Sequence, residues 1–489
     1  MAAGAEQLSA DVVVVGSGAG GAPAAALLAE AGLDVVLLEG GPHLQAPDFH
    51  DDEWSMRPRL GRIQGTDDSL QSFYAGACVG GSTVVNDALC WRPPAEVLQT
   101  WRDEHGLAEL AQPGFAAYVE QAWRDVHAEP TRSSHVNRNA EALARGAREL
   151  GWANEAMPRN VKGCARLGRC NLGCPTNAKQ STLVSYVPRA QRAGARLLAN
   201  ARVERLVLEA GRAAGIEGTR IDPTTRAPLG PLSVRAPRVL LAAGALATPG
   251  ILLRSGIAAG RGFQVHSSVY VSARFRQPIH GYFGPTMAWA VSEFADVNGQ
   301  RGPGFMLENA AVRPLQTAST LPDFGADHER AMAALSHLAS TVVVLRDHTR
   351  GSVALDDRGG TRVDYALSNA DLARMRLAIL RAAELYLAAG AEEIWLPVHG
   401  VGPVRSPRDF ARVPETLDRT RLSLLYAVHL FGGATMGGSR DAATCRPDGR
   451  LWNAEGVYVC DASSLPGNTG VNPQISIMAN ALRIAGGIA

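Results

Sequence analysis

The chain has 489 residues, of which 46% are hydrophobic and 19% charged, and its 48 basic and 47 acidic residues leave a net charge of +1. This length suits two domains, and the charge balance gives no reason to expect nucleic acid or an anionic membrane surface as a partner. No apolar run is long enough for a membrane span, and the N-terminus lacks the basic and apolar regions of a secretory signal, so we expect a cytoplasmic protein.

The first ordered stretch is typical of a dinucleotide-binding turn. Val12 to Val15 is a continuous apolar run, as a strand buried on both faces requires. Gly16, Gly18 and Gly21 follow at G-x-G-x-x-G spacing, which permits a tight bend, the approach of a diphosphate and close packing of the next helix. A second apolar strand ends at Glu39, 18 residues after Gly21, where a carboxylate can accept both ribose hydroxyls of an adenosine. We therefore predict a Rossmann-like unit near the N-terminus.

Further pieces of the same unit recur along the chain. Val203 to Leu208 alternates like a strand and returns after a turn, and Val239 to Ala243 is another buried apolar run followed by a glycine. Val457 to Cys460 is a last short strand before a closing helix from Gln474 to Ile484. The nucleotide-binding domain is therefore expected to be discontinuous, with insertions that form a second domain. The expected boundaries are 1–92, 200–262 and 440–489 for the first domain, and 93–199 and 263–439 for the second.

The inserted segments predict an α+β domain with an antiparallel sheet. Val269 to Phe275 alternates, as do parts of Leu338 to Leu345, which predicts strands with one solvent-exposed face. Asn369 is expected to cap a long helix, and a second helical face runs from Ala140 to Leu150. Asp48 to Ser72 is polar and irregular, and we expect a surface excursion there.

Four separated motifs resemble those of the glucose-methanol-choline (GMC) oxidoreductases. The similarity covers about 11–92, 164–256 and 341–489, and it is poor over about 95–160 and 260–335. The motifs are GSGAGG with Glu39, Gly80-Gly81-Ser82 through Asn86, LLAAGALATPGILLRSGI over 240–257, and a C-terminal pair formed by HLFGGATMGG around His429 and CDASSLPGNTGVNPQ from Cys460.

This resemblance implies an FAD-binding protein. The expected fold class is α/β, with a discontinuous Rossmann-like FAD-binding domain and an α+β substrate domain. Some family members tether FAD through a histidine shortly before the Asn86 position, but Val84 and Val85 stand there in this chain, so we expect noncovalent FAD. The residues expected to contact the cofactor are Gly16, Gly18, Gly21, Glu39, Gly81, Ser82, Asn86, Val203, Ala243, Asp461, Pro473 and Gln474.

The resemblance also implies where the chemistry occurs. His429 stands where the family places the residue that handles the hydroxyl proton of an alcohol, and a neutral imidazole can accept or orient that proton. Asn472 aligns with its polar partner, which can orient the substrate oxygen but cannot act as a base. Glu308 resembles the catalytic acid of the family's cholesterol oxidases, with a solvated or salt-bridged glutamate as the alternative.

A cysteine cluster separates two interpretations. Seven cysteines, an odd number, argue against a disulfide framework. Cys164, Cys170 and Cys174 follow a C-x5-C-x3-C-P pattern, which is similar to the large subunits of gluconate and fructose dehydrogenases, where three thiolates hold a [3Fe–4S] cluster. The sequences after Pro175 and over 346–367 resemble the long-chain alcohol oxidases instead, for which free thiols or a local disulfide are expected.

The sequence therefore predicts an FAD-dependent alcohol oxidoreductase acting on an unactivated or long-chain primary or secondary alcohol. Oxygen, a quinone or a redox protein could serve as electron acceptor. The alternatives are a redox-neutral lyase or decarboxylase on the same fold, and an electron-transferring subunit with an iron–sulfur cluster. Possible aromatic walls of the substrate pocket, with ordinary core residues as the alternative, are Tyr282, Phe283, Trp289, Phe294 and Phe305.

Overall fold

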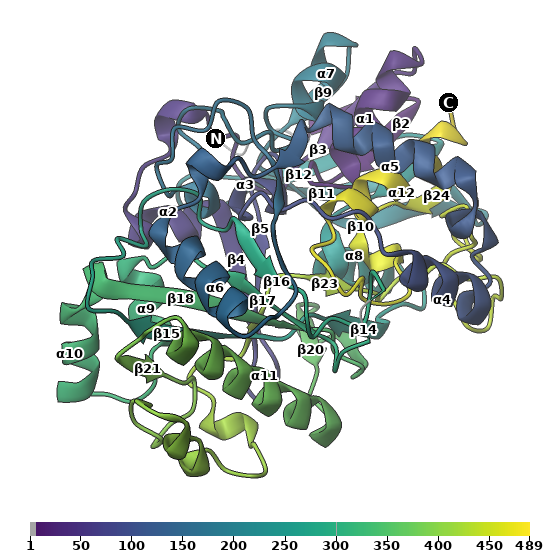
Figure 1. The fold of residues 1–489 in the computed structure, drawn as a ribbon. Helices are drawn as coiled ribbons and strands as arrows, with labels where there is room; N and C mark the ends of the chain where they lie inside the picture. Colours follow the sequence, from purple (N-terminus) through teal and green to yellow (C-terminus); the bar gives the residue numbers. More distant parts are fainter. Residues whose placement is uncertain (1–5, 300) are drawn as a thin grey trace.

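A computed structural model describes residues 6–299 and 301–489. Its centre is a parallel sheet of five strands in the order β24-β13-β2-β3-β9, which lies in the upper half of Figure 1. The continuous apolar runs predicted from the sequence form these strands because both faces of the sheet are covered. The strands are β2 (Val12–Val15), β3 (Val35–Leu38), β9 (Arg196–Leu198), β13 (Arg238–Leu241) and β24 (Val457–Val459).

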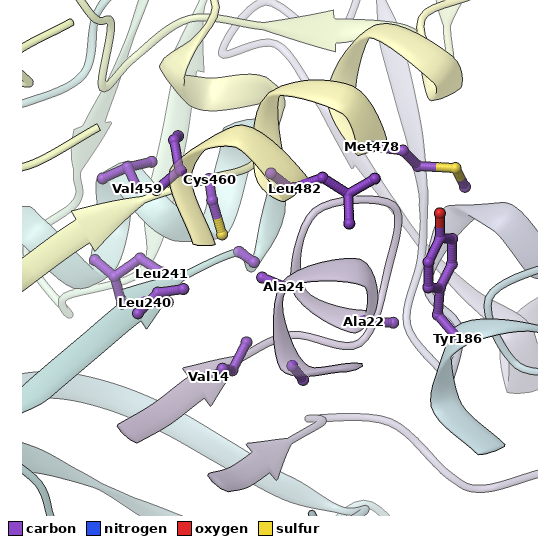
Figure 2. Packing of buried hydrophobic residues seen from close by; sticks show 14 of the residues in the cluster. Val14, Ala22, Ala24, Tyr186, Leu240, Leu241, Val459, Cys460, Met478 and Leu482 are labelled. Atoms are coloured by element: carbon purple, nitrogen blue, oxygen red, sulfur yellow. The ribbon is translucent and has the colours of Figure 1, made fainter. Parts of the chain in front are cut away.

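One face of the parallel sheet is covered by helices. Helix α1 (Gly21–Glu30) packs against β2 and β3 and lies between α7 (Tyr186–Arg192) and α12 (Gln474–Gly486). Figure 2 shows why α1 can approach so closely: it presents small alanines, including Ala22 and Ala24, toward the larger side chains of its neighbours. Helix α5 (Pro113–Asp125) packs on the outer side of α12.

The other face carries a smaller sheet in the order β1-β12-β11-β10, which packs against β13 and β3. Its strands are β1 (Glu6–Ser9), β10 (Ala201–Glu209), β11 (Arg212–Ile221) and β12 (Pro228–Arg235). The hairpin expected after Val203 is therefore confirmed, and the two sheets with their helices form the Rossmann-like unit.

A second, largely antiparallel sheet of nine strands occupies the lower half of Figure 1. Its main order is β4-β5-β22-β15-β18-β17-β16-β7, and β21 pairs with β15. Helices α6 (Arg138–Glu149) and α11 (Asn369–Ala388) pack against β18. The strands are β4 (Gly61–Gly65), β5 (Ser72–Gly76), β7 (Asn154–Ala156), β15 (Ser268–Arg274), β16 (Trp289–Val291), β17 (Phe305–Asn309), β18 (Leu338–Leu345), β21 (Glu393–Trp395) and β22 (Tyr426–Ala427).

The remaining strands form two smaller sheets, and six further helices accompany them. Strands β20, β19, β14 and β23 form a small sheet in that order, and β6 pairs with β8. Their bounds are β6 (Ala128–Pro130), β8 (Pro158–Asn160), β14 (Arg261–Val265), β19 (Gly351–Leu355), β20 (Thr361–Asp364) and β23 (Leu430–Phe431). The other helices are α2 (Glu53–Leu60), α3 (Ser82–Val85), α4 (Ala95–His105), α8 (Gly244–Arg254), α9 (Pro314–Thr320) and α10 (Ala326–Ala333).

Three expectations about local structure were wrong. The antiparallel sheet has no solvent-exposed face at its centre, since all eight positions of β18 are buried. The segment from Asp48 to Ser72 is not irregular, because it contains α2 and the edge strand β4. Helix α11 is capped by Ser368, whose hydroxyl accepts the backbone N–H of Asp371 at 3.1 Å, so Asn369 is its first helical residue.

The predicted domain boundaries cut across both large sheets. Strands β4 and β5 belong to the nine-stranded sheet although they lie within residues 1–92, and β9 pairs with β3 although it lies within residues 93–199. The division of the chain into domains at those residues stays a prediction. In the described part of the chain, no helix combines the length and the apolar character that crossing a membrane requires.

The contact between α6 and α11 gives a direct test of packing. A Cβ added at Gly146 would lie 2.2 Å from the carbonyl oxygen of Leu385, so we expect Gly146→Ala to lower the free energy of unfolding by about 2 kcal/mol through overpacking. Gly114→Ala is the matched control, because Gly114 is exposed on α5 and has no atom within 4 Å of an added Cβ. Urea denaturation of both variants measures the difference, and equal midpoints would contradict the close contact.

Candidate active site

Two glycine-rich segments face each other above the parallel sheet. A Cβ at Gly21 would lie 1.8 Å from the carbonyl oxygen of Gly16, so the turn after β2 can fold back on itself only without that side chain. Gly81 has a φ of +52°, and a Cβ there would lie 2.9 Å from the Cα of Gly18. Two stretches of bare backbone, far apart in the sequence, therefore come together at the N-terminal end of α1.

Glu39 joins these two segments. One carboxylate oxygen accepts the backbone N–H of Ser17 at 3.2 Å and its hydroxyl at 2.7 Å, and the other accepts the N–H of Gly41 at 3.0 Å. The Ser17 hydroxyl oxygen in turn accepts the N–H of Gly80 at 2.9 Å. Burial raises the pKa of Glu39, and these hydrogen bonds oppose the rise. Val203 lies buried in β10, beside a register irregularity of that strand.

Asp461 and Ala243 extend the same edge of the sheet. One oxygen of Asp461, just beyond β24, accepts the N–H of Gly244 at 2.7 Å and the hydroxyl of Thr248 at 2.6 Å, and Thr248 also accepts the N–H of Ala243 at 3.0 Å. The predicted residues that follow β2, β3, β13 and β24 therefore all lie at the carboxyl end of one parallel sheet, where open α/β sheets bind their ligands.

The segment from Gly80 to Asn86 is tied to the start of the last helix. The Asn86 amide donates to the Gln474 side-chain oxygen at 3.0 Å. The buried Lys179 ammonium donates to the carbonyl oxygens of Val84 at 2.6 Å and Asn86 at 2.9 Å, and burial lowers its pKa to about 8. Pro473 is the N-cap residue of α12 and makes no side-chain hydrogen bond there. In the glycine-rich segment, the hydroxyl of Ser82 accepts the N–H of Gly76 at 3.0 Å.

The three residues predicted to be catalytic meet at one point. His429 follows β22, Asn472 directly precedes the capped start of α12, and Glu308 lies in β17. The Asn472 amide nitrogen lies 3.4 Å from a Glu308 carboxylate oxygen and 3.5 Å from His429 Nε2. The second Glu308 oxygen and the Asn472 amide oxygen are buried and have no partner within the described chain. Hydrogen-bonding capacity is therefore left over for a ligand.

Burial shifts the two titratable groups in opposite directions. It raises the pKa of Glu308 to about 7, an increase that the Asn472 amide opposes and the charge of Asp87 reinforces. Loss of hydration lowers the pKa of His429 to about 4. The imidazole of His429 is therefore neutral at pH 7. Glu308, rather than His429, is the group that titrates near neutrality.

Sequence reasoning missed His266, which lies between β14 and β15 and is 1% exposed. Its Nδ1 lies 3.1 Å from His429 Nδ1, its Nε2 accepts the N–H of Gly470 at 3.1 Å, and its backbone N–H donates to the carbonyl oxygen of His429 at 3.1 Å. One of twelve histidines, in a segment with poor resemblance to the family, carried no signal in the sequence.

Three of the five aromatic residues expected as pocket walls, Phe283, Phe294 and Phe305, lie elsewhere. Phe294 and Phe305 stack at 4.8 Å within the core beneath α11, and Phe283 is 62% exposed, so neither group is placed around Glu308. Strand register identifies a different aromatic residue. Tyr270 of β15 and Glu308 of β17 both lie opposite Val342 of β18, and residues in register on neighbouring strands point to the same face.

Tyr426 stacks on Tyr270 with a ring separation of 5.2 Å and nearly parallel planes. Burial raises the pKa of Tyr426, and the charge of Glu308 adds to the rise, which places the tyrosine pair within electrostatic reach of the carboxyl group. The sheet face that carries Glu308 therefore also carries a stacked aromatic pair.

The three clustered cysteines are not arranged as a metal site in the described part of the chain. Over residues 6–299 and 301–489, no group of three or more His, Cys, Asp or Glu side chains is arranged to hold a metal ion, and all seven cysteines are free thiols. Cys164, Cys170 and Cys174 line one shallow cavity. Cys170 accepts a hydrogen bond from the buried Arg159 at 3.0 Å. The arrangement thus gives no support to the [3Fe–4S] interpretation or to a local disulfide.

The discontinuous Rossmann-like unit, with polar residues gathered where it meets an antiparallel sheet, defines an oxidoreductase that uses a dinucleotide cofactor. Comparison with known proteins assigns the family: residues 10–268 and 347–481 match GMC oxidoreductases, and the chain belongs to that family. GMC oxidoreductases bind FAD and act on CH–OH donors, so the protein is an FAD-dependent oxidoreductase.

Among its relatives is an uncharacterized GMC-type oxidoreductase of Mycobacterium tuberculosis (strain H37Rv), 36% identical over 97% of this chain and 75% of the relative. A long-chain-alcohol oxidase of Arabidopsis thaliana is 27% identical over 99% of this chain and 68% of the oxidase. The fold matches that of a formate oxidase variant from Aspergillus oryzae RIB40, studied for FAD modification, with a TM-score of 0.74 over 98% of both chains at 15% identity.

The residues present fit an FAD molecule. The bare backbones of Gly18 and Gly81 leave space beside the N-terminus of α1, where a diphosphate is favoured by unpaired N–H groups and the helix dipole. At the start of α12, the Ser476 hydroxyl in the first turn of the helix is buried without a partner in the described structure. A bound cofactor would supply hydrogen-bond partners for such unpaired polar groups and would lie against such glycine backbone.

A substitution at Gly18 tests FAD binding separately from the stability of the fold. An added Cβ would lie 3.7 Å from the nearest atom, so we expect Gly18→Ala to keep the stability of the apoprotein but to weaken FAD binding at least tenfold, because the methyl group enters the diphosphate space. Fluorescence titration of apoprotein with FAD measures the effect. Unchanged FAD affinity would contradict this placement, and Gly21→Ala, whose Cβ meets backbone, should instead destabilise the fold.

Glu308 gives a pH-dependent stability. Its pKa of about 7, against an ordinary 4.5, means that the folded state favours the protonated carboxyl, so its contribution is fully present below about pH 4.5 and is lost as pH rises through 7. Relative to wild type, Glu308→Gln should therefore gain on the order of 3 kcal/mol in unfolding free energy between pH 5 and pH 8. Urea unfolding at both pH values measures this gain, and a difference independent of pH would contradict the raised pKa.

Proposed function

We propose that the protein oxidises a long-chain or otherwise unactivated primary or secondary alcohol to an aldehyde or ketone, with FAD bound noncovalently. The observation that carries the proposal is the meeting of His429, Asn472 and Glu308 at the start of α12, with one carboxylate oxygen and one amide oxygen unpaired. When bound, FAD supplies the acceptor for the hydride released from the carbinol carbon.

The residues beside the proposed cofactor segment support noncovalent binding. Val84 and Val85, at the end of α3, carry no nucleophilic side chain. In this proposal the turn from Gly16 to Gly21 holds the diphosphate, and Glu39 and Val203 hold the adenosine. Asp461 and Ala243 lie along the ribityl and phosphate groups. The segment from Gly81 through Asn86 and the start of α12 at Pro473 and Gln474 face the flavin ring, where the positive helix end favours negative charge by roughly 1 kcal/mol.

The pKa values divide the proton handling between two residues. A group that must take a proton near neutral pH works best with a pKa near 7, which Glu308 has and His429 lacks. We therefore infer that Glu308 accepts the hydroxyl proton, while His429 orients the substrate oxygen. Asn472 lies between them and can donate its amide N–H groups to that oxygen.

The stacked Tyr270 and Tyr426 give the face beside Glu308 an apolar lining suited to an alkyl or aryl group of the alcohol. The alcohol oxidases among the relatives favour oxygen as the electron acceptor, with a quinone or redox protein as the alternative. None of the described contacts favours the lyase, decarboxylase or iron–sulfur subunit alternatives.

Substitution of His429 and Glu308 tests the proposed roles. His429→Ala should keep bound FAD and slow anaerobic flavin reduction by an alcohol at least a hundredfold, because the substrate oxygen loses its orienting group. In the wild type this rate should rise with pH through about 7 as Glu308 ionises, and in Glu308→Gln it should be slow and independent of pH. His50→Ala, at an exposed histidine, is the matched control.

The measurement is stopped-flow flavin absorbance across sugar, aryl, sterol and fatty alcohols. Near-normal reduction by His429→Ala would remove His429 from its role. Flavin that stays oxidised with every alcohol while product forms would favour a redox-neutral reaction instead.

A further inference from the structure

We propose that His266 is a positioning residue that fixes His429 in the tautomer with its ring proton on Nε2. In this form His429 can only donate a hydrogen bond to the substrate oxygen and cannot accept its proton. The inference rests on the proposed function for its consequence, but the assignment of the tautomer follows from contacts within the chain alone.

The assignment starts at Gly470. The backbone N–H of Gly470 donates to Nε2 of His266 at 3.1 Å. A backbone amide has only a donor to offer, so the ring nitrogen that it contacts must be an unprotonated acceptor. His266 is 1% exposed, and burial together with the neighbouring His429 and Arg346 lowers its pKa well below 6.5 against the opposing effect of a hydrogen bond with the Asn468 side chain, so the ring is neutral. A neutral ring with an unprotonated Nε2 carries its proton on Nδ1.

The tautomer of His266 then determines the tautomer of His429. Nδ1 of His266 lies 3.1 Å from Nδ1 of His429, and the two rings are nearly perpendicular. Because His266 provides the N–H in this contact, Nδ1 of His429 must accept it. Neutral His429 therefore carries its proton on Nε2. The reverse arrangement, in which Nδ1 of His429 donates to Nδ1 of His266, would keep the bond between the rings but place the Gly470 N–H against the Nε2–H of His266, in a buried setting where an unmade hydrogen bond is costly.

Main-chain and packing contacts hold the two rings in place. The N–H of His266 donates to the carbonyl oxygen of His429 at 3.1 Å, so the two residues are joined by their main chains as well as by their side chains. Phe431 packs against the edge of His266, with ring centroids 5.2 Å apart. His266 therefore cannot rotate away without breaking several contacts, and the proton on its Nδ1 is held toward His429.

One contact is given up in this assignment. The Asn472 amide nitrogen and His429 Nε2 lie 3.5 Å apart, longer than the 3.1 Å contacts of His266, and with Nε2 protonated both atoms are donors. Two N–H groups directed at one region can hold a single substrate oxygen between them and stabilise it as negative charge develops. Glu308, with a free carboxylate oxygen, is left as the acceptor for the hydroxyl proton.

The test compares two substitutions of His266. His266→Leu removes the donor to His429, whereas His266→Asn keeps an N–H group near the position of Nδ1. We expect both holoenzymes to retain FAD, His266→Leu to reduce flavin anaerobically about tenfold more slowly than wild type, and His266→Asn to recover most of that loss. Equal rates for wild type and His266→Leu, or equally slow rates for Leu and Asn, would overturn the proposal.

A spectroscopic readout is independent of turnover. In holoenzyme labelled with nitrogen-15 histidine, the His429 signals are assigned by their loss in His429→Asn. Wild type should show a protonated Nε2 and an unprotonated Nδ1, and His266→Leu should show a mixture of tautomers. A wild-type His429 protonated on Nδ1 would overturn the proposal even if His266→Leu fails to fold. If no alcohol reduces the flavin, the proposed function fails while this tautomer assignment can still hold.

Discussion

The close approach of helix α1 to the parallel sheet is the constraint on which the site depends. The turn after β2 fits only because Gly21 has no side chain against the Gly16 carbonyl, and α1 then presents alanines to its neighbours. Helix α12 packs directly on α1. Because Asn472 and Gln474 stand at the start of α12, their positions above the sheet are set by how closely these two helices pack. A larger residue in α1 would displace α12 and, with it, the polar groups that meet Glu308 and Asn86.

A single physical cause gives Glu308 and His429, the two titratable side chains of the proposed site, opposite pKa shifts. Removal from water disfavours the charged form of any group, so it raises the pKa of the acid Glu308 and lowers that of the base His429. Asp347 shows that such a shift alone does not identify a reactive residue. Burial also raises the pKa of Asp347 to about 7, but its carboxylate accepts bonds from Ser267 and Tyr365. Glu308 differs because one of its oxygens is unpaired.

The sequence analysis succeeded for features formed by residues close together in the chain and failed for features formed between distant segments. The dinucleotide-binding turn was predictable because its glycines, its strand and Glu39 lie within about thirty residues and each has a local steric role. The exposed face assigned to the antiparallel sheet was wrong because α6 and α11, which cover β18, come from distant parts of the chain. Phe283, Phe294 and Phe305 were expected around the pocket but lie at the surface or in the core, since spacing along the chain does not specify the register that places Tyr270 on the same sheet face as Glu308.

By itself, the sequence determined the type of fold, and it predicted the cofactor-binding segments and three polar residues that we propose for the reaction, because each of these is encoded in a short pattern of residue types. The tertiary structure alone decided which groups meet and in what protonation state. It brought Asn472 to within 3.5 Å of both His429 and Glu308, and it placed His266 between Gly470 and His429. Burial and hydrogen-bond direction depend on neighbours brought from several distant segments, and no local pattern records them.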